Sequence, residues 1–459
     1  MDTKALRQKI LDLAIHGKLV PQDPNDEPAS VLLERIRAEK ERLIKEGKIK
    51  KGKKSAKTSD KPHYPYELPK GWCFTNIGEL LINRDGERKP VSSAIRNKQS
   101  NKIYDYYGAA GVIDKIDDYL FDEKLLLIGE DGANLLSKSK NNAFFAEGKY
   151  WVNNHAHVLD ATDKNLLEYV AIVINAIKLD DYITGSAQPK LSQDNLNKIP
   201  IALPPLSEQK RIMEAIIHWS LLIEQIELNK IDLQTSIKQA KSKVLDLAIH
   251  GKLVPQDPND EPASELLKRI NPKAEIITDN GHYQKLPEGW CVCHINEISE
   301  SLLGKTLDRT KDSGEFKRYV CAVNVQWGYF DFTTQKRFRI EAKDFERYAV
   351  KKGDLLICEG GDVGRCAIWD NDTEMYYQNA LHRVRCKFGI SEKYIQYSLW
   401  HFKLNGVIDS LCKGVTIKHF TQSTMNKLEI PLPPFAEQKR IVSKIEGLFH
   451  QLDMIEENL

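Results

Sequence analysis

The sequence has no paired cysteine motif, no long apolar run and almost no net charge. Eight of its 459 residues are cysteine, and none belongs to a C-x-x-C pair. A zinc site or a disulfide framework needs a repeated cysteine spacing, so we expect reduced cysteines and no metal site. The apolar stretch Tyr169–Asn175 with its flanks is too short to span a membrane, and the opening MDTKALRQKI has no apolar signal region. We therefore predict a soluble, cytoplasmic protein.

The overall composition is that of an ordinary globular chain, with 41% apolar and 29% charged residues. The formal net charge of +2 neither supports nor excludes a nucleic-acid partner, because such binding depends on where the positive charge lies. A chain of this length exceeds what one hydrophobic core usually holds, so we expect two or more domains.

Internal repetition organises the whole chain. The twenty residues 11–30 (LDLAIHGKLVPQDPNDEPAS) recur without change at 245–264. Two shorter pairs are IALPPLSEQKRI at 201–212 with IPLPPFAEQKRI at 430–441, and LPKGWC at 68–73 with LPEGWC at 286–291. In the middle of the chain the segment 201–212 leads into the segment 245–264. At the ends this order is split, because the matching segment 11–30 lies near the start of the chain and 430–441 lies near its end. The order predicts a closed ring of two half-units, with adjacent termini and approximate two-fold symmetry.

The central segment, roughly 207–250, is predicted to be one long helix with Ser207 as its N-cap and with Gly251 and Pro255 ending it. At about 1.5 Å per residue its length is on the order of 65 Å. Its apolar residues alternate in steps of four and three, with a break at Lys230: Ile212, Ile216, Trp219, Ile223, Ile226, Leu233, Ile237, Ala240, Val244 and Leu247. Such a stripe needs a partner, and we predict an antiparallel coiled coil with 435–459 followed in space by 5–16.

A second helix is predicted to start after Glu27, with Pro28 in its first position, and to run to about Glu46. Its copy starts at Pro262. Eight lysines and two acidic residues follow the first copy, between Lys45 and Lys61. A solvated linker is the main interpretation of this run, and a non-specific phosphate contact is the alternative.

Two variable segments, 62–205 and 283–434, contain the same landmarks in the same order. Each has a short apolar run followed by a glycine turn, then WVNNHAHVL at 151–159 or YYQNALHRV at 376–384. We predict an α+β chain with two mixed α/β domains. The predicted domain bounds are 1–61 (helix and basic linker), 62–205 (first domain), 206–282 (central helix), 283–434 (second domain) and 435–459 (C-terminal helix).

The two domains share an outline but differ in polar residues, as expected if the differences carry sequence recognition. Asn, Gln, Arg and Lys read base edges, and Lys and Arg hold phosphates. The DNA-contact candidates in the first domain are Arg84, Arg88, Lys89, Arg96, Lys98, Tyr106, Tyr107, Asn153, Asn154, Gln188 and Lys190. In the second domain they are Lys305, Arg309, Lys311, Arg318, Asn324, Gln326, Trp327, Arg337, Arg339, Gln378, Asn379 and Lys418. A solvated surface position is the alternative for any one of them.

Other features indicate structure rather than chemistry. The glycines at 129–132 and 360–364 lack the spacing of a phosphate-binding loop, which favours tight turns. His157 and His382 correspond between the domains, and no nucleophile pattern accompanies them, so we predict buried, hydrogen-bonded histidines. We expect no catalytic residues, no cofactor and no metal in this chain.

Over essentially its whole length the chain resembles the specificity subunits of Type I restriction–modification systems. The resemblance rests on AIHGKLVPQDPNDEPAS at 14–30 and 248–264, on the two LPP elements, and on the domain segments 106–122 and 353–369. It implies that each domain is a target-recognition domain for one half of a bipartite double-stranded DNA site, with the coiled coil as a ruler. It also implies two modification subunits that carry S-adenosylmethionine, and two restriction subunits that use ATP.

Two other classes of protein remain open. A self-contained DNA methyltransferase would need an Asn/Asp-Pro-Pro-aromatic motif, and the LPPL and LPPF segments have leucine in place of Asn or Asp. A coiled-coil adaptor that binds only proteins leaves the two divergent polar domains unexplained. The unchanged twenty-residue repeat also suggests a gene-level hypothesis, in which recombination exchanges recognition domains.

Overall fold

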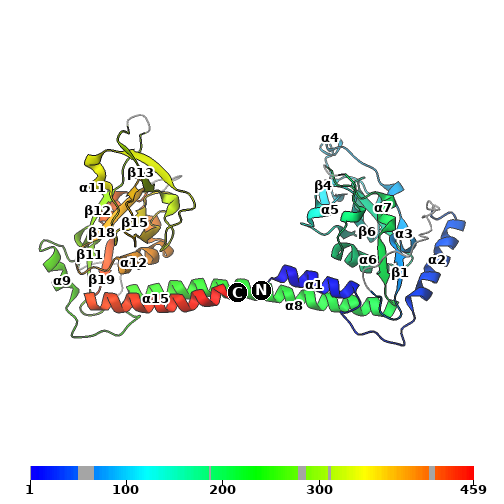
Figure 1. The fold of residues 1–459 in the computed structure, drawn as a ribbon, viewed down its shortest axis with the longest axis horizontal. Helices are drawn as coiled ribbons and strands as arrows, with labels where there is room; N and C mark the ends of the chain where they lie inside the picture. Colours follow the sequence, from blue (N-terminus) through cyan, green and yellow to red (C-terminus); the bar gives the residue numbers. More distant parts are fainter. Residues whose placement is uncertain (1, 50–66, 186–187, 278–285, 309–311, 413–418) are drawn as a thin grey trace. The chain divides into compact units, whose positions relative to one another are not determined.

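The computed structural model describes residues 2–49, 67–185, 188–277, 286–308, 312–412 and 419–459. The chain forms two compact units, Met1–Asn229 and Lys230–Leu459, each with its own sheets and helices (Figure 1). None of the helices described combines the length and the apolar character that crossing a membrane requires. The mixed α/β architecture predicted from the sequence is confirmed in both units.

In its described residues the first unit has two four-stranded sheets, ordered β2-β9-β6-β7 and β4-β3-β8-β5, and a ribbon in which β1 pairs with β10. The strands are β1 Cys73–Asn76, β2 Ile82–Asn83, β3 Tyr104–Gly108, β4 Gly111–Ile116, β5 Phe121–Asp122, β6 Leu125–Gly129, β7 Ala143–Ala146, β8 Lys149–Val152, β9 Ala156–Asp160 and β10 Pro200–Leu203. The helices are α1 Thr3–Ile15, α2 Ala29–Lys45, α3 Ile77–Leu80, α4 Ser93–Arg96, α5 Asn134–Ser137, α6 Asn165–Ala176, α7 Gln193–Lys198 and the first part of α8 Leu206–Ile249.

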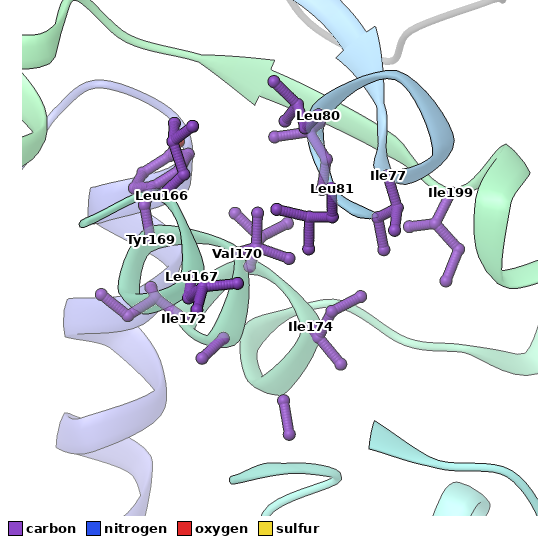
Figure 2. Packing of buried hydrophobic residues seen from close by; sticks show 14 of the residues in the cluster. Ile77, Leu80, Leu81, Leu166, Leu167, Tyr169, Val170, Ile172, Ile174 and Ile199 are labelled. Carbon is purple, nitrogen blue, oxygen red and sulfur yellow. The ribbon is translucent and has the colours of Figure 1, made fainter. Parts of the chain in front are cut away.

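The core of the first unit forms around β6 and α6. Every residue of β6 is buried, because β7 and β9 flank this strand on its two edges and helices cover its sheet. Helix α6 is apolar almost all round, which is typical of a helix enclosed on several sides. Figure 2 shows Val170 of α6 beside Leu81, the residue that follows α3, and Ile77 of α3 belongs to the same core cluster.

In its described residues the second unit has sheets ordered β12-β18-β15-β16 and β14-β13-β17, and a ribbon in which β11 pairs with β19. The strands are β11 Cys291–His294, β12 Ser299–Leu303, β13 Glu315–Val320, β14 Lys336–Ile340, β15 Leu355–Cys358, β16 Cys366–Ile368, β17 Tyr376–Tyr377, β18 Leu381–Cys386 and β19 Glu429–Leu432. The helices are the rest of α8, α9 Ala263–Ile270, α10 Ile295–Ile298, α11 Phe345–Tyr348, α12 Glu392–Leu404, α13 Val407–Leu411, α14 Gln422–Asn426 and α15 Phe435–Glu457.

Both units use the same buried polar anchors. The hydroxyl of Tyr169 on α6 donates to the carbonyl of Ala202 at 2.7 Å, and the hydroxyl of Tyr394 on α12 donates to the carbonyl of Pro431 at 2.6 Å. The two tyrosines are 225 positions apart, the same offset that relates His157 to His382. The correspondence between α6 and α12 is therefore structural as well as sequential.

A second pair of anchors joins each domain to a long helix. The indole Nε1 of Trp72 donates to Glu208 at 2.9 Å, and that of Trp290 donates to Glu437 at 3.0 Å. Both glutamates are buried. The LP-x-GWC and LPP-x-x-EQKRI segments repeat together because one supplies the indole and the other supplies its acceptor.

Helix α8 confirms the predicted long central helix, but its first residue is Leu206. Ser207 therefore lies inside the first turn rather than at the N-cap, and the amide of Gln209 already donates to the carbonyl of Pro205. Gly251 ends the helix, as predicted, in a left-handed conformation with φ of +66° that glycine adopts without steric cost.

The second predicted helix and its copy are α2 and α9, and each begins one residue later than expected. Pro28 and Pro262 are the N-caps, with extended ψ values, rather than the first helical residues. Helix α9 is shorter than α2 because Pro272 follows it closely, and the residue before a proline disfavours the helical region. Most of the lysine-rich run, from residue 50 onward, lies outside the described residues.

Each unit pairs part of α8 with a terminal helix in antiparallel fashion. In the first unit Arg7 of α1 contacts Glu227 at 3.2 Å. In the second unit Lys241 contacts Asp453 of α15 at 2.5 Å, and Lys230 donates to the carbonyl of Leu459 at 2.7 Å. The two chain termini belong to different units, so the predicted closure of the ring stays a prediction.

Candidate nucleic-acid interface

In the first unit three polar loops are joined into one group, which we call loop cluster 1: residues 130–131, 153–155 and 188–190. The amide of Glu130 donates to the carbonyl of His155 at 2.8 Å, and Nζ of Lys190 lies 3.2 Å from the Glu130 carboxylate. The side chains of Asn154, His155, Gln188 and Lys190 are exposed. Loop cluster 1 therefore presents amide, imidazole and ammonium groups to solvent from a fixed backbone.

A buried histidine holds loop cluster 1 against the sheet. Nε2 of His157 on β9 lies 2.8 Å from the carbonyl of Leu191, and its Nδ1 lies 2.6 Å from Asp85. Burial raises the pKa of Asp85, but the hydrogen bond and charge of His157, with the charge of Arg88, outweigh this and lower it overall. Arg88 also pairs with Glu130 at 2.7 Å and with Asp85 at 3.3 Å, so these ion pairs and the histidine together hold loop cluster 1 against the sheet.

The second unit repeats this frame with different side chains, and we call it loop cluster 2: residues 359–360, 378–380 and 419–420. The amide of Glu359 donates to the carbonyl of Ala380 at 2.9 Å. Nε2 of His382 lies 2.7 Å from the carbonyl of Phe420. Burial lowers the pKa of His382, which keeps its imidazole neutral. The predicted buried, hydrogen-bonded histidines are thus confirmed in both units.

The antiparallel strands β13 and β14 carry an exposed basic face, which we call the arginine face: Phe316, Arg318, Arg337 and Arg339. Arg318 lies directly opposite Arg337, and Phe316 directly opposite Arg339. Neither Arg318 nor Arg337 has an ion pair or a side-chain hydrogen bond within the part of the chain that the structure describes. Like charges opposite each other destabilise a strand pair, so this arrangement favours an anionic partner.

The family described as "Type I restriction modification DNA specificity domain" matches the chain twice, over residues 69–239 and 287–459. The chain belongs to this family. Across 99% of its length this specificity subunit is 27% identical to the Type I restriction enzyme EcoEI specificity subunit of Escherichia coli, covering 90% of that protein. Across 97% of its length it is 28% identical to the EcoAI specificity subunit of Escherichia coli, covering 88% of it.

Solved structures agree at the level of the fold. The HsdS subunit of Thermoanaerobacter tengcongensis matches with a TM-score of 0.52 and 14% identity, over 86% of this chain and 93% of that one. A chain from a study of complex assembly in the type I R-M system matches with a TM-score of 0.51 and 16% identity, over 86% and 94%. The family match confirms the predicted family, and these two structures support the fold.

The structure assigns internal contacts to several predicted DNA-contact residues of the specificity subunit. Tyr106, Asn153 and Asn324 are buried, and Asn324 donates to the carbonyls of Asp331 and Thr334. Tyr107 and Trp327 stack within aromatic groups. Four cationic residues are engaged by acidic partners: Arg84, Arg88, Arg96 and Lys305. We leave these nine side chains out of the proposed surface, because their polar groups or ring faces are already occupied.

Other predicted residues are available to a partner. The exposed ones are Lys89, Lys98, Asn154, Gln188, Arg318, Arg337 and Arg339, and the half-buried ones are Gln326, Gln378 and Asn379. Lys190 pairs with Glu130, but its side chain remains 54% exposed, so it is kept as well. Arg309, Lys311 and Lys418 lie outside the described residues. Sequence reasoning missed Phe316 and His155. The two-residue period of a strand that contains Arg318 would have placed Phe316 on the same face.

Proposed function

We propose that this specificity subunit reads a bipartite DNA target, with one half recognised by each domain, 62–205 and 283–434. The observation that carries this proposal is the duplication of one buried frame beneath two different exposed surfaces. Loop clusters 1 and 2 share their histidine anchor and backbone contacts, whereas the exposed residues differ. A repeated buried frame with different exposed residues is suited to two domains that recognise different DNA sequences.

The exposed chemistry of both surfaces fits DNA. Loop cluster 1 offers Asn154 and Gln188, whose amides pair with adenine edges, beside Lys190, which suits a phosphate. The arginine face adds cations and an aromatic ring, with the guanidinium of Arg339 lying 4.2 Å from the ring centroid of Phe316. Phosphate contacts of this kind position a protein on DNA, and the neighbouring amides can then supply specificity.

The long helix is proposed as the ruler between the half-sites. Helix α8 is continuous from Leu206 to Ile249, and antiparallel contacts join each part of it to a terminal helix. We propose that these pairs form one antiparallel coiled coil, closing the ring that the repeat order predicts and giving the chain pseudo-two-fold symmetry.

Helix α8 also supports docking of partner subunits. In the first unit Ile217, Leu221 and Leu228 are exposed and follow a four- and seven-residue spacing, which places them on one side of the helix. Such a stripe suits helices of another protein. We propose that two modification subunits, with S-adenosylmethionine, dock on the conserved helices and that two restriction subunits, with ATP, join them, while this chain itself is not catalytic.

Methylation mapping in cells is the decisive experiment. Methylated adenines should occur in a bipartite motif that disappears when the gene is deleted. In the complex, Asn154→Ala with Gln188→Ala should relax the specificity for one half of the motif and leave the other half unchanged. A motif that survives deletion of the gene would refute the proposal, as would equal changes in both halves. Methyl transfer by the purified chain alone would instead support the methyltransferase, and absence of sequence-specific DNA retardation would support the adaptor.

A further inference from the structure

Three potential metal ligands lie together in the second unit, on or at the end of helices that contain none of the predicted DNA-contact residues. Asp246 and His250 are four residues apart on α8 and at its end, and His401 comes from α12. One ligand atom from each residue lies within 4.8 Å of the other two. Zinc bonds of about 2.0–2.2 Å would hold such atoms about 3.5 Å apart, so closing the site requires movements of about an ångström.

The hydrogen bond of His250 leaves one of its ring nitrogens available to a metal. Nδ1 of His250 lies 2.8 Å from the backbone carbonyl of Asp246, and an N–H donated there leaves Nε2 with its lone pair. A carbonyl partner of this kind typically orients a metal-ligating histidine.

Space is available beside these groups. A cavity of about 490 Å³ is lined by Asp246, His250 and His401, together with the carboxylate residue Glu429. The amide nitrogen of Asn405 lies 3.1 Å from Nδ1 and 3.4 Å from Nε2 of His401. A donor so nearly equidistant from both ring nitrogens is not aligned with the lone pair of either, so the imidazole retains a lone pair that can bind a metal.

The repeat provides an internal comparison. Asp12 and His16 in the first unit are the copies of Asp246 and His250, and Nδ1 of His16 makes the same contact with the Asp12 carbonyl, at 2.6 Å. The offset of 225 that relates the anchoring tyrosines of α6 and α12 places Ala176 at the position of His401. The first unit therefore has two of the three ligands.

We propose that Asp246, His250 and His401 form a site for a divalent transition-metal ion of the zinc class, present in the second unit and absent from the first. Two imidazole nitrogens and one carboxylate oxygen are ligands that zinc accepts, with water or another oxygen in the fourth position. Because the ligands come from α8 and α12, the ion would fix the second recognition domain to the conserved helix.

The test uses the full chain, free of any histidine tag, stripped with a chelator and dialysed against Zn²⁺. Bound zinc is measured by elemental analysis, and Co²⁺ is used in parallel for its visible absorption. We expect one zinc ion per chain and a d–d spectrum typical of tetrahedral nitrogen and oxygen ligation. His401→Ala and Asp246→Asn should each weaken binding at least tenfold, whereas His16→Ala, in the same local sequence, should leave binding unchanged.

Circular dichroism of each variant shows whether it is folded, and the wild-type result decides the matter even if one variant is not. The proposal is overturned if the wild-type chain retains no zinc above background. It is also overturned if His16→Ala weakens binding as much as His401→Ala does, or if neither second-unit substitution weakens it.

Discussion

Replacing Arg318 and Arg337 together with alanine separates binding from stability on the arginine face. The two residues are directly opposite each other on β13 and β14, and both are exposed. Like charges directly opposite each other destabilise a strand pair, and cross-strand pairs contribute about 0.2–1 kcal/mol. The double variant should therefore be slightly more stable than the native chain.

Its affinity for DNA should change in the opposite direction. Each phosphate contact contributes about 0.9 to the slope of log K against log salt concentration, so loss of two contacts should reduce the slope by about 1.8. Between 50 and 200 mM salt, a fourfold range, the ratio of the two affinities should change about twelvefold. Fluorescence anisotropy of a labelled duplex across this range measures both the slope and the affinity.

A matched control variant removes two arginine charges outside the arginine face. Arg35 and Arg269 occupy equivalent positions on α2 and α9, and each forms a surface ion pair with a glutamate. Their double alanine variant should retain the native salt slope. If the arginine-face variant kept the native slope, or if the control lost as much, the arginine face would not be a phosphate-binding surface. A clear loss of stability on removing Arg318 and Arg337 would show that the pair is not repulsive.

Gly17→Ala should destabilise the first unit by about 1–3 kcal/mol, because Gly17 has a φ of +64° and an added Cβ would lie 2.4 Å from Cγ of Pro69; an unchanged melting temperature would contradict this. Glu208→Ala should cost about 1–3 kcal/mol in urea unfolding, since it leaves the buried indole N–H of Trp72 without its acceptor, and a native midpoint would mean that another acceptor replaces it. Burial lowers the pKa of His401 to about 4, below the unfolded value of about 6.5. The stability contributed by the neutral ring is therefore present above about pH 6.5 and lost as the pH falls toward 4. In chelator-treated protein, His401→Gln should make the free energy of unfolding less dependent on pH between about 6.5 and 4. If the substitution left this pH dependence unchanged, His401 would not be the group that causes it.

Local signals and the internal repeat were enough to predict the long helix and the paired histidines. The bounds of α8 were predicted to within one residue because the LPP segment before it and Gly251 after it are local signals. His157 and His382 were correctly predicted to be buried, because they correspond between the two domains and no nucleophile pattern accompanies them. Predictions that depend only on neighbouring residues in the sequence therefore hold in the folded structure.

Such local patterns could not predict which cationic residues form ion pairs within the protein and which are free to contact DNA. Arg96 looks like a surface arginine in the sequence, yet it meets Asp114, which lies 18 positions further along the chain. No local spacing reveals a partner that tertiary structure supplies. The same reason explains Asn324, whose amide is occupied by backbone carbonyls.

The identical repeat contacts helices α8 and α15 through residues that are themselves repeated. Asp26 pairs with Arg211 at 2.6 Å, and Asp260 pairs with Arg440 at 2.6 Å. The glutamates that accept the tryptophan indoles also accept from the repeat's own glutamines, Gln22 and Gln256. Since neither set of contacts involves a residue of the proposed recognition surfaces, a domain could be exchanged at the repeat without altering its attachment. Because attachment and recognition use separate residues, the repeated segments can be identical while the loops of the two domains differ.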